Sequence, residues 1–134
     1  MRKAHFLSMT GLAAVTALVC APNAMPEPSK SGATSCFFSR DWDGWKATAD
    51  ARSIYIRVLR HDIYRIDFSS ACPDLHYPNA HLVTQIRGSD SICNALDLDI
   101  KVSTGDGFAV PCIVSKLTQL SKAEAEALPK DLQP

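Results

Sequence analysis

Histidines are the first residues to consider for chemistry, because they can act as general bases or metal ligands near neutral pH. His76 and His81 lie five positions apart, and Asp74 lies just before His76. These three side chains could form a metal-dependent or hydrolase-like site. Loop histidines without a ligand role are much commoner, so we expect no catalytic residue, no metal site and no cofactor.

The four cysteines of the main part of the chain offer a second chemistry. Cys36, Cys72, Cys93 and Cys112 contain no Cys-x-x-Cys pair, so their spacing argues against a zinc ribbon and predicts two disulfides. Three connectivities are possible, and the entropies of the loops they close are too similar to choose between them. Our preferred pairing is Cys72 with Cys93 and Cys36 with Cys112.

A hairpin is predicted where β-branched and aromatic residues concentrate, at residues 53–59 and 63–69. A three-residue loop at residues 60–62 brings the apolar side chains of both strands to one face, whereas a two-residue loop mixes the faces. We therefore expect the odd-length loop, with Asp62 in the left-handed conformation. The predicted buried side chains are Ile54, Ile56, Val58, Tyr64, Ile66 and Phe68.

The opposite face of this hairpin is a candidate anion-binding site. In the expected register Arg57 lies directly opposite Arg65, with Tyr55 beside Arg57. Two guanidinium groups held side by side could bind one planar oxyanion through paired hydrogen bonds. The alternative is that Asp67 neutralises the arginines and the cluster is structural.

The remaining elements follow from alternation and capping patterns. Residues 96–102 and 108–114 alternate apolar and polar side chains, which predicts a second hairpin, and residues 81–87 form a single strand. The capping box that begins at Ser121 predicts a short helix over residues 121–128. The expected fold is mainly β, a small barrel-like or strongly bent antiparallel sheet with a short C-terminal helix and two disulfides.

Two tryptophans, Trp42 and Trp45, lie in an aromatic segment that starts at Cys36. We expect them to cover the core. The alternative is that they form an exposed platform for a glycan or a peptide.

The beginning of the chain is typical of a secretory signal. Arg2 and Lys3 precede an apolar run at residues 6–19, and proline and small residues follow. The run is shorter than the ~20 residues that a membrane-spanning helix needs. We expect a signal peptide over residues 1–24, a flexible tether over residues 25–34 and one disulfide-linked β domain over residues 35–134.

Export implies a location in the bacterial periplasm, without a transmembrane segment in the mature chain. The alternative is a lipid anchor on Cys20, although Val19 is a poor residue for the position before a lipidated cysteine.

Length and charge limit the classes of function. The chain has 134 residues, with 14 Lys and Arg against 14 Asp and Glu and 46% hydrophobic residues. This size suits one small domain, and the zero formal charge argues against a nucleic-acid partner.

The order of several short motifs resembles a known family. Cys-Phe-Phe comes first, followed by Arg-Asp-Trp-Asp-Gly-Trp, a Tyr-Arg-Ile-Asp strand leading to Cys72-Pro73, the Ser-Ile-Cys step at Cys93, and Pro-Cys-Ile-Val around Cys112. Over residues 35–128 this arrangement is similar to an uncharacterised four-cysteine family of small exported bacterial proteins, a domain of unknown function. The resemblance implies export and, for many members, lipidation, but it implies no activity, cofactor or catalytic residue.

The expected function is therefore a non-enzymatic binding or structural module of the envelope. Its partner would be an envelope protein, a glycan or a small anionic ligand. The alternative is a small metal-dependent or hydrolase-like enzyme that uses His76 and His81.

Overall fold

The structure, a computed structural model, describes residues 35–105 and 107–134. The predicted signal peptide at residues 1–24, the tether at residues 25–34 and the anchor site at Cys20 lie outside these residues. Among the described residues, no helix is long and apolar enough to cross a membrane.

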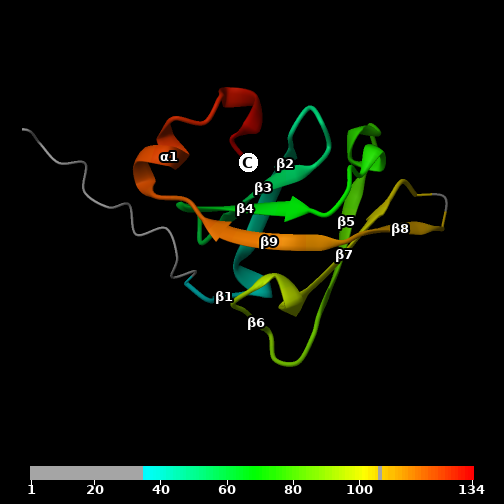
Figure 1. The fold of residues 1–134 in the computed structure, drawn as a ribbon, viewed down its shortest axis with the longest axis horizontal. Helices are drawn as coiled ribbons and strands as arrows, with labels where there is room; N and C mark the ends of the chain where they lie inside the picture. The colour runs from blue at the N-terminus through cyan, green and yellow to red at the C-terminus, as the bar shows by residue number, and fades with distance from the viewer. Residues whose placement is uncertain (1–34, 106) are drawn as a thin grey trace, which may run out of the picture.

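The larger of the main sheets has four antiparallel strands in the order β2-β3-β4-β9. The central hairpin is formed by β3 and β4, whose alternate β-branched and aromatic residues pack into the core. The two outer strands flank this hairpin (Figure 1). The strands span Trp42–Ala47 (β2), Ser53–Val58 (β3), Asp62–Phe68 (β4) and Val114–Gln119 (β9).

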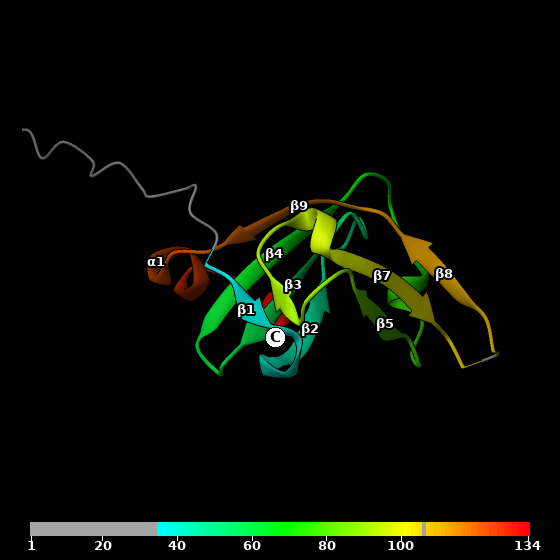
Figure 2. The ribbon, with the colours of Figure 1, turned by 90° about the horizontal axis from the view of Figure 1, so that it is seen from below.

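The second main sheet has three antiparallel strands in the order β5-β7-β8: His81–Ile86, Leu98–Ser103 and Ala109–Cys112. Only Ile113 separates β8 from β9, so one nearly continuous segment passes from this sheet into the four-stranded sheet (Figure 2). The prediction of a mainly β, strongly bent antiparallel fold is confirmed, and the described strands do not close into a barrel.

Short elements complete the fold. A two-stranded sheet pairs Phe37 with Ile92, and the predicted C-terminal helix is confirmed by a capping box between Ser121 and Glu124. The elements are β1 Phe37–Phe38, η1 Ser39–Asp41, η2 Pro73–His76, β6 Ser91–Ile92, η3 Ala95–Asp97, α1 Lys122–Glu126 and η4 Lys130–Leu132.

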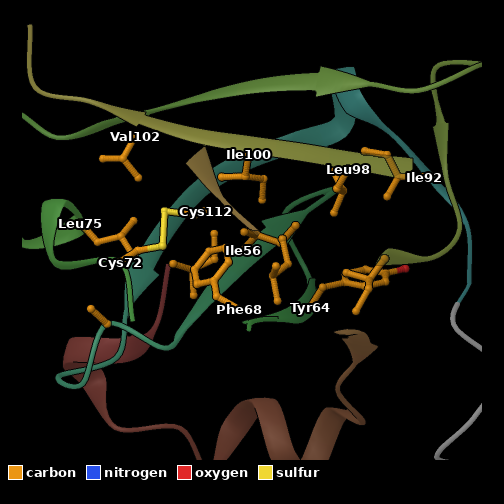
Figure 3. Packing of buried hydrophobic residues seen from close by; sticks show 14 of the residues in the cluster. Ile56, Tyr64, Phe68, Cys72, Leu75, Ile92, Leu98, Ile100, Val102 and Cys112 are labelled. Atoms are coloured by element: carbon orange, nitrogen blue, oxygen red, sulfur yellow. A yellow bond between two sulfur atoms is a disulfide. The ribbon is translucent and has the colours of Figure 1, made fainter. Parts of the chain in front are cut away.

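The core lies between the two main sheets (Figure 3). All six side chains that the first hairpin was predicted to bury are buried. They pack against Leu98, Ile100 and Val102 of β7. Trp42 and Trp45 are partly buried and pack against this core. The expectation that the tryptophans cover the core is therefore confirmed.

The register of the first hairpin differs from the prediction. Val58 pairs with Asp62, so the three-residue loop is at residues 59–61 and not at residues 60–62. Leu59 and Arg60 have positive φ, with values of 49° and 70°, whereas Asp62 belongs to β4. The shift is two residues, which preserves the faces of both strands but changes every cross-strand partner.

The second hairpin is shorter than predicted. Leu96 lies in η3 and is 79% exposed, because a capping box between Asn94 and Asp97 starts a 3-10 turn before β7. On the return strand Cys112 is buried as expected, but Phe108 is 79% and Val110 is 49% exposed.

Tyr64 couples the core to the beginning of the described chain. Its ring centroid lies 4.6 Å from that of Phe37, and its hydroxyl donates a hydrogen bond to the Ser35 carbonyl oxygen at 2.9 Å. Desolvation by burial, together with the negative charge of Asp62, raises the pKa of Tyr64 above its ordinary value of 10.0.

We expect Tyr64→Phe to lower the free energy of unfolding by about 1 kcal/mol at neutral pH, through loss of this hydrogen bond. In the unfolded chain the tyrosine loses its proton near pH 10.0, whereas in the folded chain it does so at a higher pH. The stability that results from the raised pKa of Tyr64 is therefore lost as the pH rises through the pKa of the folded state. The stability advantage of the unmodified protein should therefore shrink in urea titrations above about pH 10. Tyr77→Phe, at a 57% exposed position, is the control, and an equal pH dependence in both variants would contradict the assignment.

Candidate functional site

The four predicted disulfide cysteines form two disulfides, but the preferred pairing was wrong. The bonds join Cys36 to Cys93 and Cys72 to Cys112. The pairing of β1 with β6 brings Cys36 beside Cys93, while Cys72 at the start of η2 reaches the end of β8. The second bond lies in the core between the sheets (Figure 3).

The predicted anion-binding residues lie on the same two strands but in a different arrangement. Tyr55 pairs with Arg65, and Arg57 pairs with Ile63, so the two arginines are diagonal neighbours and not directly opposed. Tyr55 is only 8% exposed, although it lies on the face away from the main core.

Each arginine has a carboxylate nearby. The Arg65 Nε–H donates to Asp67 Oδ1 at 2.7 Å, and Arg57 Nε lies 3.8 Å from Asp43 Oδ2. Burial opposes the charge on Arg65, but the hydrogen bond and charge of Asp67 outweigh it and raise the pKa of Arg65. Anion binding by Arg57, Arg65 and Tyr55 stays a prediction, and a ligand there would compete with Asp43 and Asp67.

The surroundings of Arg57 explain why it is partly covered. A side-chain carbon at Gly44 would lie 3.4 Å from Arg57 Nη2 and 3.8 Å from Pro134, so the end of the chain lies close to this guanidinium group. Gly44 has a φ of 76° and occupies the irregular stretch of β2 between Trp42 and Trp45. The side chain of Arg57 is 36% exposed as a result.

The two candidate histidines are exposed and lie on either side of the same loop. His76 ends η2, whereas His81 begins β5, where its Nδ1 is 3.3 Å from the Asn79 carbonyl oxygen. Within residues 35–105 and 107–134, no group of three or more His, Cys, Asp or Glu side chains is placed to hold a metal ion. A catalytic role for these histidines stays a prediction.

A pocket of about 330 Å³ lies where the η2 loop meets the β7–β8 hairpin. Its volume is within the range of small-molecule sites. The lining combines three exposed apolar side chains, one buried valine, one carboxylate and one hydroxyl: Tyr77, Phe108, Val110, Val102, Asp74 and Thr104.

Hydrogen bonds to backbone carbonyl oxygens hold the η2 loop in place beside this pocket. Pro73 begins η2, and the Tyr77 N–H closes the turn by donating to the Asp74 carbonyl oxygen at 3.2 Å. The Asn79 side chain donates to the Thr104 carbonyl oxygen at 2.7 Å, which ties the loop to the end of β7. Asp74 and Tyr77 are thus positioned opposite the β7–β8 hairpin.

The chemistry of the pocket is that of a binding site with an apolar wall. Tyr77 is 57% exposed and Phe108 is 79% exposed, so two aromatic side chains are available to a ligand. Among the described residues, the carboxylate of Asp74 makes no hydrogen bond or ion pair, which leaves its oxygens available as acceptors.

Sequence reasoning missed this pocket. The alternation expected for residues 108–114 places Phe108 and Val110 on the same side of the strand as Cys112, which is buried, and so gives no indication that they are exposed. Gly105 and Gly107, both at positive φ, lie in the connection between β7 and β8, but no local pattern shows that the side chains after this connection are exposed.

The model of a family of unknown function, DUF6491, matches residues 1–133. No curated protein and no solved structure matches the chain. The predicted resemblance to a domain of unknown function is thus confirmed, whereas the four-cysteine, exported and bacterial character of that family stays a prediction.

Proposed function

Because the chain belongs to the DUF6491 family of unknown function, we propose from the geometry of the pocket that it is a non-enzymatic module that binds sugars. The single observation that carries the proposal is the pairing of two exposed aromatic side chains, Tyr77 and Phe108, with the available carboxylate of Asp74.

Sugars combine the two properties that this lining offers. A sugar ring has an apolar C–H face that packs on aromatic rings, and its hydroxyl groups donate hydrogen bonds to a carboxylate. The negative charge of Asp74 disfavours an anionic ligand in this pocket. Neutral sugars of an envelope glycan are therefore the proposed ligand class.

We also propose that the protein is exported. The two disulfides support this proposal, because disulfides persist in oxidising compartments. The basic and apolar start of the chain, over residues 1–24, supports it independently.

Phe108→Ala should weaken sugar binding about fivefold or more, since aromatic packing contributes about 1 kcal/mol beyond area burial. The probes are diacetylchitobiose, cellobiose and maltose, titrated against the uniformly ¹⁵N-labelled protein and followed by amide chemical shifts. Shifts should concentrate at Asp74, Tyr77 and the residues of β8. Asp74→Asn should weaken binding by a smaller factor, because an amide oxygen still accepts a hydrogen bond.

Leu96→Ala is the matched control, because Leu96 is also 79% exposed but lies in η3, outside the pocket lining. Unchanged affinity in Phe108→Ala, or no shifts with any probe at about 10 mM, would overturn the proposal. Cleavage of a probe during the titration would show that the module is an enzyme.

A further inference from the structure

The strand β5 is a sheet edge that lacks the protective features of the other edges. Among the strands that the structure describes, β7 is its one neighbour in the sheet order. The residues of β5, His81–Ile86, include no proline and no Asp, Glu, Lys or Arg. The other outer strands of the two main sheets carry such features: Pro111 in β8, Lys116 in β9, and Asp43 and Lys46 in β2, where the register also shifts.

The backbone of β5 presents a row of groups toward the open side. The Arg87 N–H donates to the Asp97 carbonyl oxygen, which shows that the odd-numbered residues of this segment bond to the β7 side. Antiparallel hydrogen bonds alternate along a strand, so the even-numbered residues point outward. Within the described part of the chain, no hydrogen bond involves the outward groups of Leu82, Thr84 and Ile86.

In the described ranges, 35–105 and 107–134, no other element covers the middle of this edge. Thr84 pairs with Ile100, so their side chains lie on the same face of the sheet. Ile100 is buried at 1% exposure, whereas Thr84 is exposed. The core therefore ends between these two strands, and β5 is accessible at its midpoint.

We propose that β5 pairs antiparallel with β5 of a second copy of this chain. The two copies would be related by a two-fold axis that passes between their Thr84 residues. Such an axis lies perpendicular to the sheet and keeps the core-facing sides of both copies together. It places Thr84 opposite the partner's Thr84 and Leu82 opposite the partner's Ile86. All three outward-pointing residues of each strand then find hydrogen-bond partners.

Side-chain chemistry supports a second copy as the occupant. Leu82 and Ile86 are half-buried apolar residues that would cover each other across the interface, and threonine pairs are favourable across antiparallel strands. At the end of β5, Arg87 would lie opposite the partner's His81. Arg87 already forms an ion pair with Asp99 of its own chain, with Nη2 3.7 Å from Oδ2. Along the strand, no Lys or Arg would lie opposite another Lys or Arg, and β5 itself contains no Asp or Glu.

The dimer should be concentration-dependent, because one strand pair buries less than a standard protein interface. Sedimentation from about 10 µM to about 1 mM should show the mass of the oxidised protein rise from one chain toward two. A mass of one chain throughout that range would overturn the proposal, and the edge would then be free for an extended segment of another protein.

Thr84 would lie opposite the partner's Thr84, which allows a specific test of the interface by substitution. Thr84→Lys and Thr84→Glu should each remove dimerisation, because each places like charges opposite each other. An equimolar mixture of the two variants should restore it. Gln85→Lys is the control, because Gln85 is exposed on the same strand but would lie opposite the partner's Val83, so this variant should dimerise as the unmodified protein does.

Amide hydrogen exchange distinguishes this edge from other interfaces. On dimerisation the amides of Leu82, Thr84 and Ile86 should exchange at least tenfold more slowly, while those of Val83 and Gln85, which already face β7, change little. A dimer that persists in Thr84→Lys, or that leaves the three outward amides unprotected, would overturn the proposal.

Discussion

Replacing Cys72 and Cys112 together with alanine is expected to lower the free energy of unfolding by about 4 kcal/mol. The bond joins positions 40 residues apart, and in the chain-entropy model a loop of this length contributes that amount by restricting the unfolded chain. Both cysteines are also buried, at 6% and 2% exposure, so the variant loses packing between the sheets. Urea unfolding under non-oxidising and non-reducing conditions measures the difference.

Peptide mapping without reduction is the control for this experiment. The unmodified protein should yield one linked peptide pair containing Cys36 and Cys93 and another containing Cys72 and Cys112. The double variant should keep the first pair. A loss of stability below about 1 kcal/mol, or recovery of Cys72 linked to Cys93, would contradict the role of this bond.

Ile66→Ala is expected to destabilise the domain by about 3 to 4 kcal/mol, in the middle of the range for buried isoleucine truncations. Ile66 is 0% exposed and lies in β4, between Ile54 of β3 and Leu117 of β9. Its removal leaves a cavity beside β4, one of the two inner strands of the four-stranded sheet. Thermal and urea unfolding at neutral pH measure this loss.

Ile113→Ala is the matched control. The same side chain is removed, but Ile113 is 61% exposed in the connection between β8 and β9, so the cost should stay within about 0.5 kcal/mol. Equal losses in the two variants would mean that the core is not where the structure places it.

The fold class and the buried face of the first hairpin were predictable because both depend on local patterns. Alternation of Ile54, Ile56 and Val58 with polar residues determines which face is buried, whichever exact register the hairpin adopts. The loop position was not predictable, because Leu59 and Arg60 adopt positive φ without the Gly or Asn that normally indicates it.

The disulfide connectivity depends on contacts between segments far apart in the chain. Cys36 meets Cys93 because Phe37 pairs with Ile92 in a strand pair of only two residues on each side. Such short strands have no recognisable period, and the loop entropies of the competing pairings are alike. No local pattern could therefore select the observed pairs.

The pocket was missed for a different reason. Alternation tells which side of a sheet a residue occupies, but not whether another sheet covers that side. Val110 pairs with Val102 on the same face, yet Val102 is 1% exposed and Val110 is 49% exposed. The opposing sheet therefore covers Val102 and does not cover Val110.

The order of the disulfides along the chain also determines how the protein responds to backbone cleavage. The two bonds overlap, because Cys72 lies inside the loop closed by Cys36 and Cys93, and Cys112 lies outside it. A single cut by a protease anywhere between Cys36 and Cys112 therefore leaves the two fragments covalently joined. Between Cys72 and Cys93, the segment that contains the exposed η2 loop and β5, both bonds join the fragments, so a nicked molecule separates only after complete reduction.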